Sequence, residues 1–131
     1  MIAHRVLLAA GLLAGVMLGS LPAVAADWKP FTQADFSAAQ KDGKSILVDI
    51  FAPWCPTCRA QKPILANLGT NPKFKDVAHF DIDFDSQKDL LRKFNVRSQS
   101  TLITFKGKQE VGRSTGDTNA ASIERLLDKA L

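Results

Sequence analysis

The sequence contains few side chains that bind metal ions. Its 131 residues include only two cysteines, two histidines and two methionines, and both methionines and one histidine fall near the start of the chain, in a segment that we expect to be removed. This leaves Cys55, Cys58 and His79, whereas a closed zinc site needs about four protein ligands. Because Arg59 follows the second cysteine, the pair is not a c-type haem attachment site. A two-thiolate copper(I) site, or a metal shared between two chains, stays open.

Long basic runs, internal repeats and low-complexity tracts are also absent. The formal net charge is +4, and basic residues such as Lys73, Lys75, Arg92 and Lys93 are interspersed with Asp and Glu. This pattern favours a solvated surface over a nucleic-acid-binding patch, so we expect no nucleic-acid partner. The modest length and uniform composition of the chain favour a single domain.

The first 26 residues have the pattern of a secretory signal. Met1–Arg5 carries positive charge, Val6–Gly19 is an uncharged apolar run, and Ser20–Ala26 contains the small residues that a signal peptidase recognises. The apolar run is shorter than the roughly 18 residues of a membrane-spanning helix, so a permanent anchor is less favoured. We therefore predict a signal peptide over residues 1–26 and a domain over residues 27–131. That domain is expected to be periplasmic or otherwise exported, and soluble after cleavage.

The rest of the sequence predicts helices that alternate with strands. Ser45–Phe51 is a continuous apolar run rich in β-branched residues, broken only by Asp49, and is typical of a buried central strand. Helices are expected over residues 32–41, 55–67 and 86–95 and from about 118 onward, with Thr32 and Ser86 as caps and Pro63 inside the second. Further strands are expected over residues 77–84, 101–106 and 110–114. With residues 27–31 as a lead-in, this order predicts an α/β fold, with a mixed sheet of about four strands flanked by helices on both faces.

The two cysteines lie where the predicted central strand leads into a helix. As a structural staple, a disulfide over so short a loop would contribute only about 2 kcal/mol. A helix N-terminus favours an anion, so Cys55 is expected to supply an attacking thiolate. Cys58 lies one turn further along the helix and is expected to be less exposed, which suits a resolving thiol that attacks a mixed disulfide. The spacing therefore favours redox chemistry over a staple.

Asp49 is the one charged residue in the apolar strand. Burial of a carboxylate raises its pKa, and a carboxyl group close to Cys58 could take the proton of that thiol. The competing interpretation is an aspartate at the strand end that is hydrated by water. We favour the functional interpretation because Asp49 comes shortly before Cys55 in the sequence.

These motifs resemble the active-site segment of the thioredoxin superfamily. The likeness rests on Val48-Asp49, on the run from Ala52 to Cys58 and on Pro63, and it extends over nearly the whole domain, including the hairpin and Gly116 before the last helix. It implies a thioredoxin-like fold, with Cys55 as nucleophile, Cys58 as resolving thiol and Asp49 as buried acid–base group.

The resemblance also implies a surface that binds substrate. Trp54 would shield the redox disulfide and line this surface, and Gln99, Ser100 and Thr101 would form the facing loop. His79 lies where relatives often carry a lysine that pairs with the buried aspartate. It would then modulate that group, although an exposed strand histidine is the favoured interpretation.

Ser100 departs from the family pattern, which has a cis-proline at this position. A cis bond before serine costs roughly 3 kcal/mol, so the loop is expected to be either trans and reshaped or held in a strained conformation. In relatives the backbone of this loop pairs with substrate, and the proline is thought to keep metal away from the cysteines. Gln99 and Ser100 could instead donate hydrogen bonds to a substrate or a thiolate.

The sequence therefore predicts an exported thiol:disulfide oxidoreductase that reduces or exchanges protein disulfides. It needs no bound cofactor or metal, and a membrane-embedded electron donor or acceptor would recycle it. Thr57 offers no positive charge beside Cys58, which favours a reductant over an oxidant that introduces disulfides. Two different functions stay open for the same thiols: a module that binds or delivers metal, and a non-catalytic adaptor.

Overall fold

The strand β2 (Ser45–Phe51) lies at the centre of the sheet in a computed structural model, which describes residues 28–131. It pairs in parallel with β3 (Ala78–Asp83) on one side and antiparallel with β4 (Thr101–Lys106) on the other. All of its residues between the first and the last are buried. The apolar run therefore forms the central strand that it predicts, because both of its faces are covered.

The sheet has five strands in the order β1-β3-β2-β4-β5. The strand β5 (Gln109–Thr115) forms the predicted hairpin with β4, and β1 (Trp28–Pro30) pairs in parallel with β3 at the opposite edge. The predicted α/β fold with a mixed sheet is thus confirmed. The estimate of about four strands is corrected by β1, which lies in the expected lead-in. Three residues are too few to show an alternating pattern, so β1 is recognisable only from its pairing.

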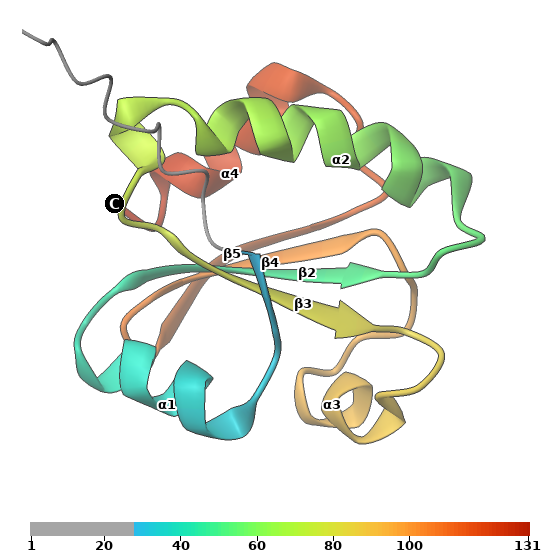
Figure 1. Ribbon diagram of the computed structural model, residues 1–131, viewed down its shortest axis with the longest axis horizontal. Coiled ribbons are helices and arrows are strands. Elements are labelled where there is room, and N and C mark those ends of the chain that lie inside the picture. Colours follow the sequence, from blue (N-terminus) through green and yellow to red (C-terminus); the bar gives the residue numbers. More distant parts are fainter. Residues whose placement is uncertain (1–27) are drawn as a thin grey trace, which may run out of the picture.

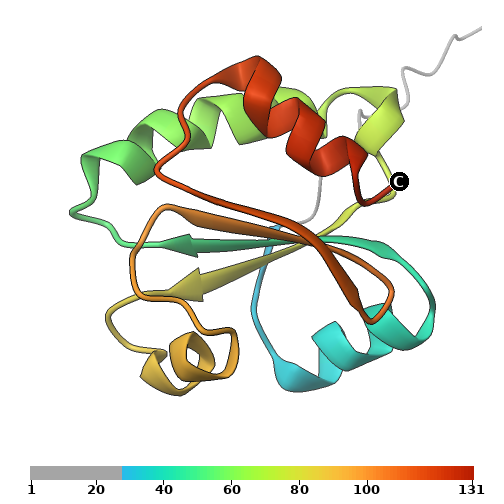
Figure 2. The same ribbon diagram turned by 180° about the vertical axis from the view of Figure 1, so that it is seen from behind.

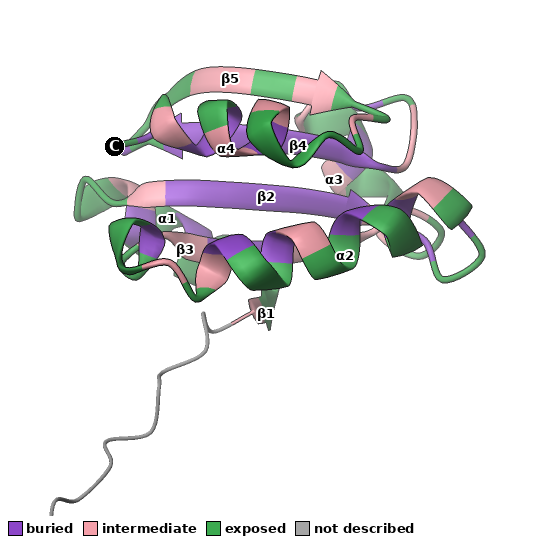
Figure 3. Ribbon diagram, turned by 90° about the horizontal axis from the view of Figure 1, so that it is seen from above, coloured by how far each residue is buried: buried purple, intermediate pink, exposed green. Residues whose placement is uncertain are grey.

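Helices cover both faces of the sheet (Figures 1 and 2). The helices α2 (Pro56–Gly69) and α4 (Ala120–Asp128) lie on one face, and α1 (Gln33–Lys41) and α3 (Lys88–Lys93) lie on the other. A short 3₁₀ turn, Pro72–Phe74, follows α2. Figure 3 shows β2 and β4 almost wholly buried between these layers.

Each face of the sheet has its own apolar core. The core under α1 and α3 is rich in aromatic rings, including Phe31, Phe36 and Phe80. The core under α2 and α4 consists mainly of aliphatic side chains, including Leu47 and Leu102. Since successive residues of a strand point to opposite faces, Leu47, Asp49 and Phe51 all face the side of α2.

The helix boundaries follow the local capping groups. Thr32 caps α1 as predicted, because its Oγ1 accepts a hydrogen bond of 3.1 Å from the Asp35 amide. Pro63 lies inside α2 without ending the helix. The last helix begins at Ala120, later than expected, because the side chain of Asn119 accepts the hydrogen bond of its first turn.

Ser86 does not cap α3, and this part of the prediction is wrong. The helix starts at Lys88, and Gln87 stands at its N-cap position without a side-chain cap bond. Instead, Asp83 Oδ1 accepts hydrogen bonds from the amides of Asp85 and Ser86, which forms a turn before the helix.

The predicted signal peptide, residues 1–26, lies outside the described residues, and so does the predicted domain boundary after it. Within residues 28–131, no helix has the length and apolarity that a membrane crossing requires.

Candidate active site

The two thiols lie at the point where β2 passes into α2. Cys55 is the N-cap residue of α2, and its Sγ accepts a hydrogen bond of 3.1 Å from the amide of Cys58. Pro56 occupies the first turn, where its missing N–H costs no hydrogen bond. Both cysteines are free thiols. The sulfur of Cys55 therefore lies among the free N–H groups of the helix N-terminus.

Cys58 is not the less exposed of the two thiols, contrary to the sequence prediction. The exposed fraction is 1% for Cys55 and 4% for Cys58, so both are buried. The pKa of Cys58 is raised to about 11, first by burial and then by its hydrogen bond with Cys55, while the backbone groups of Ala52 and Ser100 act in the opposite direction. Cys58 is therefore protonated at neutral pH, and its use as a nucleophile requires a base.

Asp49 lies in the interior, on the face of the sheet that α2 covers. Its exposed fraction is 3%, and its Oδ1 has no hydrogen-bond partner. Its pKa is raised to about 7, first by burial and then by the charge of Asp81, while Lys62 acts in the opposite direction. The interpretation as a hydrated aspartate at the strand end is therefore wrong. A carboxyl group with a pKa near neutrality can both accept and return a proton.

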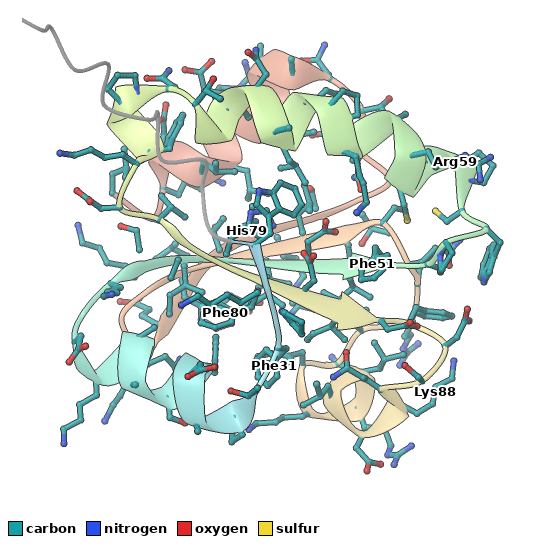
Figure 4. All side chains as sticks on the ribbon, in the orientation of Figure 1. Phe31, Phe51, Arg59, His79, Phe80 and Lys88 are labelled. Carbon is teal, nitrogen blue, oxygen red and sulfur yellow. The ribbon has the colours of Figure 1, made fainter. Side chains whose placement is uncertain are left out.

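His79 and Asp81 lie beside Asp49 on the neighbouring strand. Asp81 is the register partner of Asp49, and His79 precedes it on the same face of β3, so both face α2, as Figure 4 shows for His79. The His79 Nε2 atom lies 3.7 Å from Asp81 Oδ1. Sequence analysis missed Asp81, although its place between the apolar residues Phe80 and Ile82 was a usable signal.

The expectation that His79 is exposed is also wrong. Its exposed fraction is 6%, because the ring of Trp28 on β1 lies against it with a centroid distance of 3.7 Å. Burial, followed by the charge of Lys62, lowers the pKa of His79 to about 3. The imidazole is therefore neutral, and it contributes no positive charge to Asp49 at physiological pH.

Asp49, His79 and Asp81 also have the spacing of a metal site. Each offers one ligand atom, and these atoms lie within 4.8 Å of one another. However, the positive charge of Lys62 on α2 acts on all three groups: it opposes the rise in the pKa of Asp49 and Asp81 that burial causes, and it adds to the lowering of the pKa of His79. Because the ammonium group of Lys62 would repel a bound metal ion, we assign no metal to this cluster.

Ser100 occupies a strained position in the loop that precedes β4. Its φ angle is 56°, and none of the peptide bonds between residues 28 and 131 is cis. The left-handed region costs an L-residue roughly 1–2 kcal/mol, so the loop is trans and reshaped, and strained as well. The Ser100 carbonyl accepts hydrogen bonds from the Gly116 amide (2.9 Å) and from Gln61 Nε2 (3.3 Å).

The neighbours of Ser100 differ in their access to solvent. Gln99 is half-buried, whereas Thr101 has an exposed fraction of 2%. The Thr101 hydroxyl donates to the Ser98 carbonyl at 2.8 Å and lies 3.0 Å from the hydroxyl of Thr115. The structure therefore places Thr101 inside the loop as a support, while Gln99 remains accessible.

Trp54 is the exposed aromatic residue next to the thiols. More than half of it is exposed (54%), and its Nε1 donates a hydrogen bond of 2.8 Å to Asp85 Oδ2. Arg59 on the first turn of α2 reaches back to the Pro53 carbonyl and marks the same end of the molecule in Figure 4. Asp85, which sequence analysis did not single out, thus orients the indole beside the thiol pair.

Known proteins with a similar sequence are thioredoxins. A sequence model of the Thioredoxin family matches residues 27–129. Thioredoxin-2 of Saccharomyces cerevisiae is 34% identical over 91 residues, which are 70% of this chain and 85% of the yeast protein. Thioredoxin H-type of Fagopyrum esculentum is 36% identical over 72% of this chain and 76% of its own length. For Thioredoxin-2 of Pyricularia oryzae the match spans 53% of that protein's length at 33% identity.

A solved structure supports the same relationship. The crystal structure of Trxlp from Edwardsiella tarda superposes with a TM-score of 0.75 at 40% sequence identity, over 77% of this chain and 98% of that chain. The sequence match, the shared fold and the cysteine pair at the start of α2 agree, and the chain therefore belongs to the thioredoxin family of thiol:disulfide oxidoreductases.

Proposed function

We propose that this protein is an exported oxidoreductase that reduces or exchanges disulfide bonds in other proteins through Cys55 and Cys58. The observation that carries the proposal is the hydrogen bond of 3.1 Å from the Cys58 amide to Cys55 Sγ at the N-terminus of α2. This contact places Cys55 Sγ at the first turn of the helix with Cys58 one turn behind it, the arrangement that attack and resolution by two thiols require. The export rests on the signal-like sequence of residues 1–26.

In the first step the Cys55 thiolate attacks one sulfur of a substrate disulfide. A bond forms between Cys55 Sγ and that sulfur, and the substrate S–S bond breaks. The departing sulfur leaves with the electron pair as a thiolate and takes a proton from water. Trp54, held by Asp85, the half-buried Gln99 and the backbone of the buried Ser100 are the groups that we assign to substrate contact.

In the second step Cys58 resolves the mixed disulfide. Its thiol, whose pKa of about 11 keeps it protonated, gives its proton to the carboxylate of Asp49. The new thiolate attacks Cys55 Sγ, a Cys55–Cys58 disulfide forms, and the second substrate sulfur leaves as a thiolate. The two electrons of the dithiol have then passed to the substrate.

A further dithiol must return two electrons before the next cycle. For an exported protein we place this donor in the membrane, because the electrons have to cross the membrane to reach the protein. The absence of positive charge at Thr57 favours this direction over the reverse, in which a membrane acceptor would withdraw electrons. The reduction potential of the pair decides the direction: about −270 mV indicates a reductant, and about −120 mV an oxidant.

The test is trapping with Cys58→Ser. This variant should accumulate mixed disulfides with other proteins through Cys55, and these should disappear on treatment with dithiothreitol. Cys55→Ser is the matched control and should trap nothing. A Cys58→Ser protein that forms no mixed disulfide, while the wild type binds copper(I) through the pair, would replace the redox function by metal delivery. Amino-terminal sequencing of the protein from the extracytoplasmic fraction tests export, and a mature start at residue 26 or 27 is expected.

A further inference from the structure

Gln61 is a buried polar side chain that the proposed reaction does not use. Its exposed fraction is 1%, and it lies on α2 three residues after Cys58. Residues three apart share a face of a helix, so Gln61 and Cys58 point toward the same side. An aliphatic side chain would fill this place without the cost of burying an amide, so packing alone gives no reason for a glutamine here.

The amide of Gln61 connects α2 to two separate loops. Its Nε2 donates to the carbonyl of Ser100 at 3.3 Å, before β4, and to the carbonyl of Asp117 at 2.8 Å, before α4. Both hydrogens of the NH₂ group are used in this way, while its Oε1 has no partner among the described residues. The side chain thus contributes donors to two carbonyls.

Ser100 is the point at which this connection reaches the thiols. Its backbone is in the left-handed region, with φ 56°, and such a conformation persists in an L-residue only when neighbouring groups hold it. The carbonyl of Ser100 is held from two sides, by Gln61 and by the Gly116 amide. Burial raises the pKa of the Cys58 thiol most, and the backbone of Ser100 acts in the opposite direction as the smallest of the effects on that thiol.

We propose that Gln61 is a positioning residue for the resolving step, because it ties the strained Ser100 loop to the face of α2 that carries Cys58. This inference rests on the proposed function of Cys58 as the resolving thiol. Gln61 touches neither the substrate nor the reacting sulfurs. When its donors are lost, only the Gly116 amide holds the Ser100 carbonyl, and the loop is no longer tied to the helix face that carries Cys58. The attack by Cys55, whose sulfur accepts its hydrogen bond within α2, does not depend on this contact.

The matched substitution is Gln61→Met, which keeps the length of the side chain and removes both donors. The control is Thr104→Val, which removes a buried hydroxyl from β4 that contacts the carbonyl of Gly112 at 3.4 Å. Both variants lose a buried polar group, but only one contacts the Ser100 loop. Gln61→Leu is a second variant for the case that Gln61→Met does not fold.

The experiment follows the two steps separately in a single turnover. The substrate is a synthetic disulfide between two short peptides, each with its own fluorophore. Release of one peptide reports the attack by Cys55, and release of the other reports resolution by Cys58. In Gln61→Met the first rate should stay within about twofold of the wild type, and the second should fall about tenfold, because the loop beside the resolving thiol is no longer fixed. In Thr104→Val both rates should match the wild type.

Two results would overturn the inference. One is a folded Gln61→Met or Gln61→Leu variant with an unchanged rate of resolution, and the other is an equal loss in Thr104→Val. Failure of the proposed function is recognised separately with Cys58→Ser, which would then release the second peptide at the wild-type rate.

Discussion

Asp49 and Asp81 face one another across the central strands β2 and β3 as register partners, and the Oδ1 atom of each is buried without a hydrogen-bond partner. Burial raises the pKa of both carboxyl groups, and the charge of Asp81 raises that of Asp49 further. The interior of the protein thus holds two carboxyl groups of raised pKa on the face of the sheet that α2 covers. Their titration leads to measurable effects on both rate and stability.

Asp49→Asn should slow the resolving step. Only the carboxylate can take the proton of Cys58, so the rate of resolution in the wild type should rise with pH through about 7, the pKa of Asp49. The variant should lose this rise and be slower by about 10²-fold or more at pH 8. Stopped-flow measurement of peptide release between pH 5.5 and pH 8.5 gives the rate of resolution for the wild type and for the variant. A variant that keeps the wild-type pH profile would remove Asp49 from the mechanism.

The same substitution should stabilise the folded protein at high pH. The pKa of Asp49 is raised from 3.8 to about 7, so the folded state holds the proton more tightly than the unfolded state. Ionisation of the buried Asp49 therefore lowers the free energy of unfolding. This loss is absent below pH 3.8, grows as the pH rises and is complete above about 7, where it is on the order of 4 kcal/mol. Urea unfolding of the disulfide form at pH 5 and pH 8 should show wild-type stability falling relative to Asp49→Asn. Parallel curves would mean that the carboxyl group is not buried as described.

His79 should make the protein sensitive to acid. Its pKa is lowered from 6.5 to about 3, so the unfolded chain binds a proton below pH 6.5 that the folded protein excludes. The contribution of the neutral His79 to the free energy of unfolding is fully present above pH 6.5 and is lost as the pH falls towards 3. His79→Phe, which keeps an aromatic ring against Trp28, should remove a loss of roughly 3 kcal/mol between pH 7 and pH 4. Urea unfolding at these pH values measures it, and equal acid sensitivity of variant and wild type would count against a buried neutral imidazole.

Trp54→Ala should reduce activity without reducing stability. The indole is more than half exposed, so its removal costs little core packing. We expect kcat/KM for a protein disulfide to fall about tenfold, as for loss of an aromatic contact residue worth ~1–2 kcal/mol, with a Tm within a few degrees of the wild type. Insulin reduction and thermal unfolding test this. Leu131→Ala, another exposed apolar residue, is the control and should leave both unchanged.

Gly112→Ala should destabilise the fold. A Cβ at this position would lie 2.7 Å from Leu126 Cδ1, 3.1 Å from Thr104 Oγ1 and 3.2 Å from Lys129 Cδ. Overpacking of this kind costs about 1–3 kcal/mol, because these side chains have to move to make room for the added carbon. Chemical denaturation measures the loss. Gly116→Ala is a useful comparison, since its φ of +74° strains an alanine while nothing lies within 4 Å of the added carbon. A neutral Gly112→Ala would show that α4 is less closely packed.

The elements whose signals are local were predictable from the sequence. The apolar run of Ser45–Phe51 defines β2, and Thr32 caps α1, because an apolar strand and a capping hydroxyl act within a few residues. The place of the cysteine pair at the start of α2 was predictable for the same reason, since the free N–H groups of a helix belong to its own first turn. Local patterns therefore indicated the fold class and the two thiols.

The surroundings of these thiols could be determined only from the tertiary structure. Strand pairing brings Asp81 opposite Asp49, and the short strand β1 places Trp28 over His79 and buries it. The strained Ser100 and its contact with Gln61 likewise join segments that are far apart in the sequence. Charge, burial and pKa depend on distance in space, so the amino-acid sequence by itself determined which groups can react, and only their packing decided which carry a proton, which are covered and which are held in place.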